Sequence, residues 1–250
     1  MRIIPQIETP ASESYASFEG SLIKIINGMK KSGLSGLDGP EGLPSVVLEQ
    51  NFGINTLILC KDLKDRYKNL NTAYAFNMRD KNRISIISDL MTLKRIGVKD
   101  IIVSEGLHPL KTMFKAAKPV YDIDVFGLAL ILKRDFMNSL HGIDGLDFFN
   151  LGVVIGASTL ADELKAKKLI KTGVDRLIVN YTGENPDVNM VNYIKSENKE
   201  VFLYIKESDI KYPLDDFIKS NEDLNIDGII VKVVSEKSNI FTQYFEKNEI

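Results

Sequence analysis

The sequence has a single cysteine, Cys60, and only two histidines, His108 and His141. One cysteine cannot form a disulfide within the chain, and it cannot build a zinc site made of cysteine ligands. Two histidines also argue against a histidine-rich metal centre or a histidine proton relay. We therefore expect no metal site, and we expect any chemistry to rest on carboxylates, amides, lysine, arginine, tyrosine or a bound cofactor.

The sequence also lacks an excess of charge of either sign and lacks a long apolar run. Its 32 basic and 34 acidic residues leave a formal charge of −2, so no basic face is expected to bind nucleic acid. No apolar run approaches the roughly 18 to 20 residues that span a bilayer. Residues 1–6 do not resemble a signal peptide. These absences predict a cytoplasmic protein with neither a nucleic-acid nor a membrane partner.

Three short motifs of nucleotide and ester chemistry are missing as well. The chain has no Gly-x-x-x-x-Gly-Lys loop for phosphates, no Gly-x-Gly-x-x-Gly segment after a strand, and no Gly-x-Ser-x-Gly turn. The function must therefore be sought among residues that the fold gathers at one face.

Strand-like and helix-like segments alternate along the 250 residues, 44% of which are hydrophobic. Several strand-like segments are near-continuous runs of Ile, Val and Leu, as in parallel strands buried on both faces. The expected strands are residues 3–8, 34–38, 71–78, 100–104, 150–156, 176–181, 200–205 and 227–234. The expected helices are residues 18–31, 81–96, 124–137, 160–172, 187–197, 213–220 and 237–247, with mixed helix and loop over 43–68. Eight strand–helix units favour one α/β domain, a (β/α)8 TIM barrel over residues 1–250, with a doubly wound open sheet as the alternative.

The carboxyl ends of the strands are the first place to look for function, because barrel enzymes build their active sites there. Gln6 and Glu8 end the first strand and share one face of it. If Glu8 is partly desolvated at the barrel mouth, its pKa rises and it can serve as a general acid. The alternative is a solvated strand-end residue, or one paired with a lysine.

Polar residues also follow the third and fourth strands. Asn77, Arg79 and Asp80 lie at the junction between the third strand and its helix. Arg79 suits a phosphate or carboxylate group, whereas Asp80 can equally be the N-cap of the helix. Glu105 and Gly106 follow the fourth strand, and Gly106 permits close approach of the backbone to a ligand or simply forms a turn.

The later strands contribute an amide and two lysines. Asn180 ends the sixth strand, where its amide can hydrogen-bond the edge of a heterocycle, and Tyr181 beside it either contacts substrate or packs. Lys206 and Lys232 end the seventh and eighth strands, and a buried lysine there is a candidate Schiff-base nucleophile. We expect Gln6, Arg79, Glu105 and Asn180 to converge on one mouth.

The order of segments resembles that of the methylenetetrahydrofolate reductase family over most of residues 3–182. Gln6-Ile7-Glu8-Thr9-Pro10 is similar to the family's first-strand Glu-x-x-Pro-Pro segment. Asn77-Met78-Arg79-Asp80-Lys81-Asn82 resembles its Thr-Cys-Arg-Asp-x-Asn motif and is the most specific stretch. Further likeness lies in residues 88–90, 97–103, 149–153 and 168–175.

The resemblance implies a flavoprotein oxidoreductase of one-carbon metabolism, with FAD in the barrel mouth, NAD(P)H as reductant and a folate as substrate. It places Asn77, Arg79, Asp80, Glu105 and Gly106 near the cofactor. Asn180 and Tyr181 would face the substrate.

The chain departs from the family pattern at several site positions. The family's first-strand acid falls on Gln6, so proton donation would shift to Glu8, because an amide cannot donate that proton at neutral pH. The family's His is Ala75, its Gly-Asp pair is Gly106-Leu107, and its Thr-Gln is Val179-Asn180.

The leading hypothesis is therefore a divergent relative that binds a folate or other pterin one-carbon carrier, with Glu8 as acid and with Gln6 and Asn180 as amides facing the pterin. The alternatives are a catalytically silent barrel that serves as a pterin-binding partner subunit, and a flavin-free methyltransferase. A homo-oligomer or a methyltransferase partner is left open by the sequence, as are the carrier, the electron donor and the role of residues 39–70.

Overall fold

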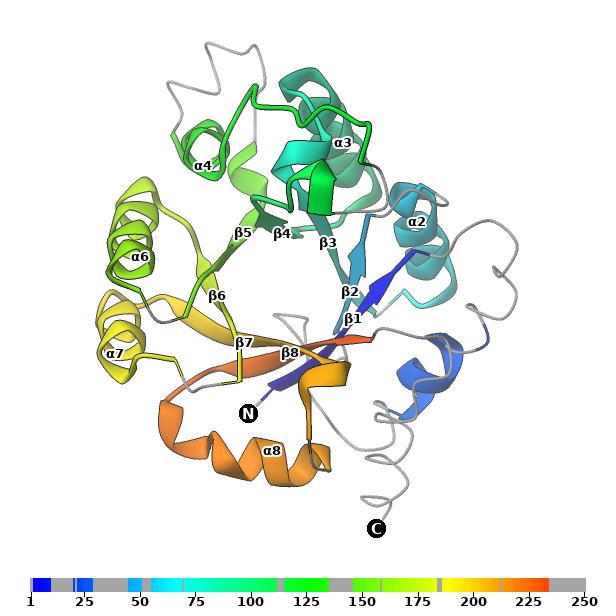
Figure 1. Ribbon diagram of the computed structural model, residues 1–250. Helices are drawn as coiled ribbons and strands as arrows, with labels where there is room; N and C mark the ends of the chain where they lie inside the picture. The colour runs from blue at the N-terminus through cyan, green and yellow to red at the C-terminus, as the bar shows by residue number, and fades with distance from the viewer. Residues whose placement is uncertain are drawn as a thin grey trace.

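Eight parallel strands form a closed barrel in the computed structural model, in the order β1-β2-β3-β4-β5-β6-β7-β8 (Figure 1). The structure describes residues 2–9, 20, 22–28, 45–50, 55–68, 70–111, 115–134, 146–157, 159–183, 186–211 and 213–233. The predicted (β/α)8 TIM barrel is confirmed, and the open-sheet alternative is wrong because β8 pairs with β1. The extent of the domain, residues 1–250, stays a prediction.

The strands form the inner wall and the helices surround them (Figure 1). The strands are β1 (Arg2–Glu8), β2 (Ser45–Glu49), β3 (Asn71–Asn77), β4 (Asp100–Ser104), β5 (Asn150–Ile155), β6 (Arg176–Asn180), β7 (Glu200–Lys206) and β8 (Gly228–Val233). The helices are α2 (Thr56–Arg66), α3 (Arg83–Ile96), α4 (Val125–Lys133), α6 (Leu160–Thr172), α7 (Val188–Ser196) and α8 (Leu214–Ser220), and residues 22–28 are also helical. Among the described residues, no helix is long and apolar enough to cross a membrane.

The second strand is the main correction to the expected elements. β2 (Ser45–Glu49) pairs with β1 on one side and with β3 on the other, so this place in the barrel does not belong to residues 34–38. The expectation of mixed helix and loop over 43–68 was therefore wrong at β2. The apolar run of β2 is only Val46-Val47-Leu48, which is too short to indicate a strand from the sequence. Residues 34–38 and the expected helix 237–247 lie outside the described residues.

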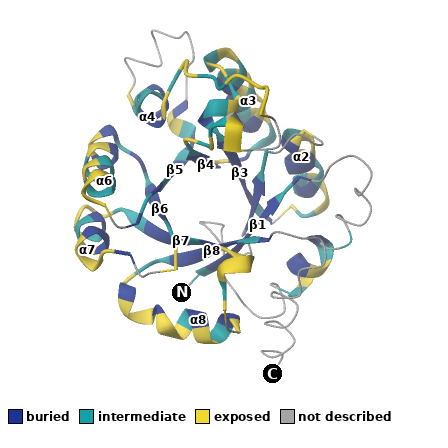
Figure 2. Ribbon diagram, in the orientation of Figure 1, coloured by how far each residue is buried: buried dark blue, intermediate teal, exposed yellow. Residues whose placement is uncertain are grey.

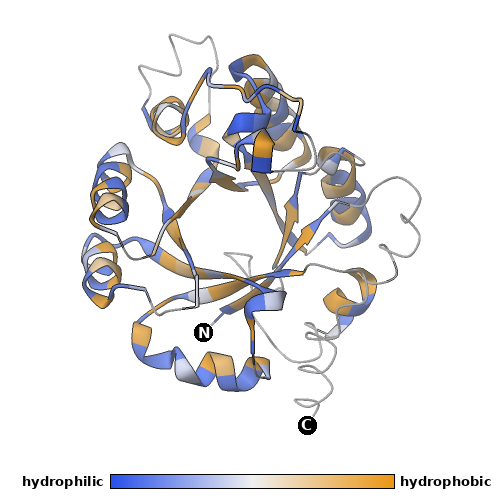
Figure 3. Ribbon diagram, viewed as in Figure 1, coloured by the Kyte–Doolittle hydropathy of each residue, from blue (hydrophilic) through white to orange (hydrophobic). Residues whose placement is uncertain are grey.

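Side chains alternate between two separate cores. One face of each strand packs against the helices, whereas the other fills the barrel with a small cluster that includes Ile4, Val47, Ile102, Phe202 and Ile230. Both faces of the strands are therefore largely buried, while yellow, exposed residues lie mainly on the helices and loops (Figure 2). Figure 3 shows the matching hydropathy pattern, with orange residues along the strands.

Gly228 is required where β8 begins. A Cβ at this position would lie 2.5 Å from the carbonyl oxygen of Arg2 and 2.8 Å from the ring of Phe202. The large Phe202 ring can occupy the barrel interior because its neighbour on β8 has no side chain.

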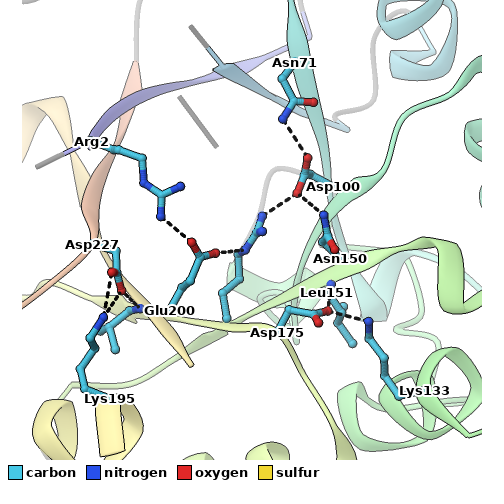
Figure 4. Close-up of polar contacts among 12 residues, drawn as sticks. Arg2, Asn71, Asp100, Lys133, Asn150, Leu151, Asp175, Lys195, Glu200 and Asp227 are labelled. Carbon is cyan, nitrogen blue, oxygen red and sulfur yellow. Dashed lines mark hydrogen bonds and ion pairs between the residues drawn. The ribbon is translucent and has the colours of Figure 1, made fainter. Parts of the chain in front are cut away.

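An ionic network closes the amino-terminal end of the barrel (Figure 4). The guanidinium of Arg176 pairs with Asp100 at 2.6 Å and with Glu200 at 2.9 Å, and Glu200 also contacts Arg2 at 2.5 Å. Asn71 and Asn150 donate hydrogen bonds to the two oxygens of Asp100. Arg176 and Asp100 are each 1% exposed. Because it lies opposite the carboxyl ends, this network is expected to support stability rather than catalysis.

Cys60 is fully buried in α2, and burial raises its pKa to about 12, although Lys64 attracts the thiolate and opposes this shift. The thiolate is the reactive form of cysteine. We therefore expect Cys60 to resist a thiol reagent such as Ellman's reagent at pH 8 and to react fully in denaturant. Full labelling of the folded protein within minutes would contradict this prediction.

Candidate functional site

The carboxyl ends of β8, β1 and β2 bring a lysine, an amide and two carboxylates together inside the mouth of the barrel. Gln6 is the register partner of Lys232, and Glu8 is the register partner of Glu49. Ile4, Val47 and Ile230 on the same strands point into the barrel. Since side chains alternate, Gln6, Glu8, Glu49 and Lys232 share that inner face.

The ammonium of Lys232 is the centre of this group. Its Nζ forms ion pairs with Glu8 and, at 2.8 Å, with Glu49 Oε2. Gln6 Nε2 donates a hydrogen bond to the same Glu49 oxygen at 2.9 Å. The side chains of Lys232 and Glu49 are each 15% exposed, whereas that of Glu8 is 41% exposed. We call Gln6, Glu8, Glu49 and Lys232, together with Tyr204, the Lys232 cluster.

The electrostatic surroundings keep Lys232 protonated. Burial works to lower its pKa, but attraction by Glu49 and Tyr204 and hydrogen bonds to Glu49 and Glu8 outweigh burial, so the pKa is raised. A Schiff-base nucleophile needs the neutral amine. The arrangement therefore favours a role for Lys232 as a cation and hydrogen-bond donor.

Tyr204 and Asn180 extend the cluster along β7 and β6. They are register partners, and Tyr204 packs against the apolar cluster inside the barrel. Burial raises the pKa of Tyr204; Lys232 opposes the shift, and Glu49 and Glu8 add to it, so Tyr204 stays a phenol. Neither Tyr204 nor Asn180 makes a side-chain hydrogen bond to another described residue.

The residues after β3 and β4 bond mainly to one another. Asn77 donates to Asp80 at 3.0 Å and accepts from Ser104 at 2.6 Å. Arg79 donates to the carbonyl of Gly106 at 3.1 Å, and its guanidinium lies 5.7 Å from the ring centre of Tyr121. Arg79 thus orders this loop.

Gly106 has a backbone reason to be glycine. Its φ of +78° is in the left-handed region, and a Cβ would lie 2.8 Å from Cβ of Asn77. A turn that packs closely on β3 accounts for this residue.

The most specific stretch of the family resemblance has a local structural role. Asn82, not Asp80, is the N-cap of α3, because its side chain accepts a hydrogen bond from the Ser85 backbone. Lys81 pairs with Asp89, and the buried Tyr74 hydroxyl donates to Asp89 at 3.1 Å. These contacts fix α3 against β3.

Two predicted site residues interact away from the Lys232 cluster. Glu105 pairs with Lys165 of α6 at 2.5 Å. Tyr181 packs edge-on against Phe217 of α8, with ring centres 5.3 Å apart. Of the four residues expected to converge, Gln6 and Asn180 share the inner wall, whereas Arg79 is bonded to the β4 loop and Glu105 to α6.

Glu49 and Tyr204 are the members of the Lys232 cluster that the sequence analysis did not single out. Glu49 follows the short run Val46-Val47-Leu48, as Glu8 follows an apolar strand, so its signal was a carboxylate directly after buried residues. That signal was missed because residues 43–68 were expected to be mixed helix and loop. Tyr204 lies within an apolar strand, where a tyrosine is typical of packing. Among the described residues, no cluster of His, Cys, Asp and Glu is arranged to hold a metal ion.

A shallow hollow of about 360 Å³ lies between the starts of α3 and α4, lined by Arg83, Tyr121, Asp122, Ile123, Asp124, Gly127 and Ile131. None of these residues belongs to the Lys232 cluster. We place the candidate site at the barrel mouth because of its partly buried charged groups, and not because of this hollow.

Comparisons with known proteins identify a fold but no family. No protein-family model and no curated protein matches the sequence. Solved structures of the tryptophan synthase alpha-subunit from Pyrococcus furiosus are similar, for example one variant with a TM-score of 0.60 and 12% identity, covering 99% of this chain and 95% of that chain. The tryptophan synthase complex of the same organism gives 0.56 and 11%, with the same coverage. At this identity the similarity shows the TIM-barrel fold alone.

Proposed function

We propose that the protein binds a folate or another pterin one-carbon carrier at the carboxyl-end mouth and acts on its one-carbon unit. The observation that carries the proposal is the Lys232 cluster, a mostly buried ammonium between two carboxylates at the face where barrel enzymes work. The amides of Gln6 and Asn180 on the same wall suit the polar edge of a pterin.

Glu8 is the proposed proton-transfer group. It is paired with Lys232, as the alternative in the sequence analysis allowed, and in our proposal it accepts a proton as a base and returns it as an acid. It is also the more exposed of the two carboxylates and so the easier one for a substrate to reach. Gln6 holds Glu49 in place by its hydrogen bond.

Within the part of the chain that the structure describes, the residues predicted to hold a flavin do not form an open site for it. Asn77 and Asp80 are bonded to each other, Arg79 is bonded to the Gly106 carbonyl, and Glu105 is paired with Lys165. These contacts order the loop and engage the polar groups that a flavin diphosphate would need. We therefore derive no step through FAD or NAD(P)H, and both stay predictions from the family resemblance.

Binding and turnover of a reduced folate test the proposal. We expect saturable binding of 5-formyltetrahydrofolate by isothermal titration calorimetry. The Glu8→Gln variant should keep this binding and lose on the order of 100-fold or more in turnover of a one-carbon folate, the usual contribution of a general acid or base. A visible spectrum of the purified protein, before and after addition of FAD, tests the flavin. Failure to bind any folate, with or without FAD, would refute the proposal.

A second candidate is a partner subunit without catalysis of its own. Its support is a group of exposed leucines, Leu107 and Leu110 after β4 and Leu160 and Leu164 at the start of α6, each between 58% and 71% exposed. The Glu105–Lys165 ion pair joins these two segments. Exposed apolar groups of this kind often mark protein interfaces. One similar structure is of the tryptophan synthase a2b2 complex of Pyrococcus furiosus. Folate binding with no effect of Glu8→Gln on any turnover, and co-purification with a methyltransferase, would favour this candidate.

A further inference from the structure

Two polar groups of the Lys232 cluster have unused hydrogen-bonding capacity side by side. An ammonium has three N–H donors, and within the described residues Lys232 forms ion pairs with Glu8 and Glu49 alone. Both contacts to Glu49 are made through Oε2, from Lys232 and from Gln6. No hydrogen bond or ion pair among the described residues uses Glu49 Oε1.

One N–H of the Lys232 ammonium and Glu49 Oε1 are therefore a donor and an acceptor next to each other on the inner face of the barrel. Both side chains are largely shielded from water. The two side chains are each 15% exposed, so an unsatisfied polar atom there is more costly than on an open surface. The complementary ligand edge has an acceptor next to a donor. A lactam edge, a ring carbonyl beside a ring N–H, has that order.

We propose that Lys232 and Glu49 together recognise the lactam edge of a 4-oxopyrimidine ring. The ring carbonyl accepts a hydrogen bond from the Lys232 ammonium, and the adjacent ring N–H donates to Glu49 Oε1. The proposal rests on the proposed function, in which this ring is part of a pterin carrier, and it assigns the specificity of the site to β8 and β2.

The remaining members of the wall fit this arrangement. Tyr204 lies close enough to Lys232 and Glu49 to interact with both electrostatically. Its side chain is half-buried, and its hydroxyl makes no hydrogen bond to another described residue. Asn180 is its neighbour on β6. A flat ring that contacts Lys232 and Glu49 would therefore meet a phenol and an amide along the same wall.

The arrangement predicts discrimination between two closely matched ligands. Folic acid has the 4-oxo lactam edge, whereas aminopterin has an amino group in place of the carbonyl and no hydrogen on the adjacent ring nitrogen at neutral pH. In aminopterin the amino group, a donor, would face the Lys232 ammonium. The lone pair of the adjacent ring nitrogen would face the Glu49 carboxylate. We expect it to bind on the order of 10- to 100-fold more weakly, the range for losing hydrogen bonds to charged groups.

The experiment measures both ligands and uridine, a lactam-containing pyrimidine, by calorimetry at pH 7.5 on the full chain and on Glu49→Gln. In this variant the side-chain oxygen of the new glutamine has to accept from Lys232 and Gln6, as Glu49 Oε2 does now. The NH2 group then takes the place of Glu49 Oε1, so a donor replaces the acceptor that would face the ring N–H. Glu49→Gln should lose 10-fold or more in affinity for folic acid and little for aminopterin. Glu163→Gln, which removes a carboxylate paired with Lys167 on α6, is the matched control and should match the wild type within about twofold.

The outcomes separate this inference from the proposed function. Equal binding of folic acid and aminopterin by the wild type overturns lactam recognition while pterin binding stands, and this comparison does not depend on how well a variant folds. Binding of uridine but of neither pterin, reduced 10-fold or more by Glu49→Gln, supports lactam recognition and overturns the pterin proposal. Absence of binding for all three ligands overturns both.

Discussion

Replacing Arg176 with methionine is expected to lower the free energy of unfolding by about 3 to 5 kcal/mol, the range for removing one partner of a buried ion pair. Arg176 and Asp100 are each 1% exposed, and the 2.6 Å contact between them supplies the positive charge closest to Asp100. Asn71 and Asn150 would still donate to Asp100, but two amides do not replace a full positive charge. Chemical denaturation with guanidinium chloride, followed by circular dichroism, measures the loss.

The control for this prediction is Arg134→Met, which removes an exposed guanidinium that contacts only a backbone carbonyl of α6 within the described residues. Its effect should stay below about 0.5 kcal/mol. Adding Asp100→Asn to Arg176→Met should recover part of the loss, because the buried negative charge is then gone. A decrease of less than about 1 kcal/mol for Arg176→Met would show that the network at the amino-terminal end contributes little to stability.

Lys232→Met is expected to have the largest effect at the candidate site, a loss of folic acid affinity on the order of 100-fold. The change removes the proposed donor for the ring carbonyl, and it leaves Glu8 and Glu49 next to each other with no shared cation. Two neighbouring carboxylates repel each other, so one of them tends to become protonated. Isothermal titration calorimetry at pH 7.5 measures the affinity, and Lys61→Met, which removes an exposed lysine paired with Asp65 on α2, is the matched control.

The effect of Lys232→Met on the free energy of unfolding is also expected to depend on pH. Because the folded protein raises the pKa of Lys232, the stabilisation from its ion pairs is fully present below the ordinary lysine pKa of about 10.4 and is lost as the pH rises beyond it toward the higher folded value. The difference in unfolding free energy between wild type and Lys232→Met should therefore hold steady through the neutral range and shrink above about pH 10.4. A difference that is absent at pH 7 would mean that the ammonium does not stabilise the pair of carboxylates.

Most of the barrel strands could be predicted from the sequence because their signal is local. Runs such as Asp-Ile-Ile-Val-Ser at residues 100–104 are long enough in Ile and Val to identify a strand buried on both faces, and β4 has these bounds. β2 could not be predicted in this way, because three apolar residues are compatible with a strand, a helix or a loop. Only pairing with β1 and β3 defines Ser45–Glu49 as a strand.

The candidate site was predictable only in part. Alternation along β1 placed Gln6 and Glu8 on one face, and the structure gives both residues partners in the Lys232 cluster. The same reasoning could not place Glu105 and Tyr181, which follow their strands directly. Past the end of a strand the alternation no longer fixes the direction of a side chain, and these two turn toward Lys165 and Phe217.

The sequence by itself determined the number and kind of most elements, the balance of charge, and which strands end in polar residues, because each of these depends on residues that are close together in the chain. Only the tertiary structure decided that Lys232 lies between Glu8 and Glu49, because that contact requires β8 to close against β1 and β1 to pair with β2. Closure of the barrel brings the last strand next to the first, and no periodicity within a single segment specifies which charged side chains then meet.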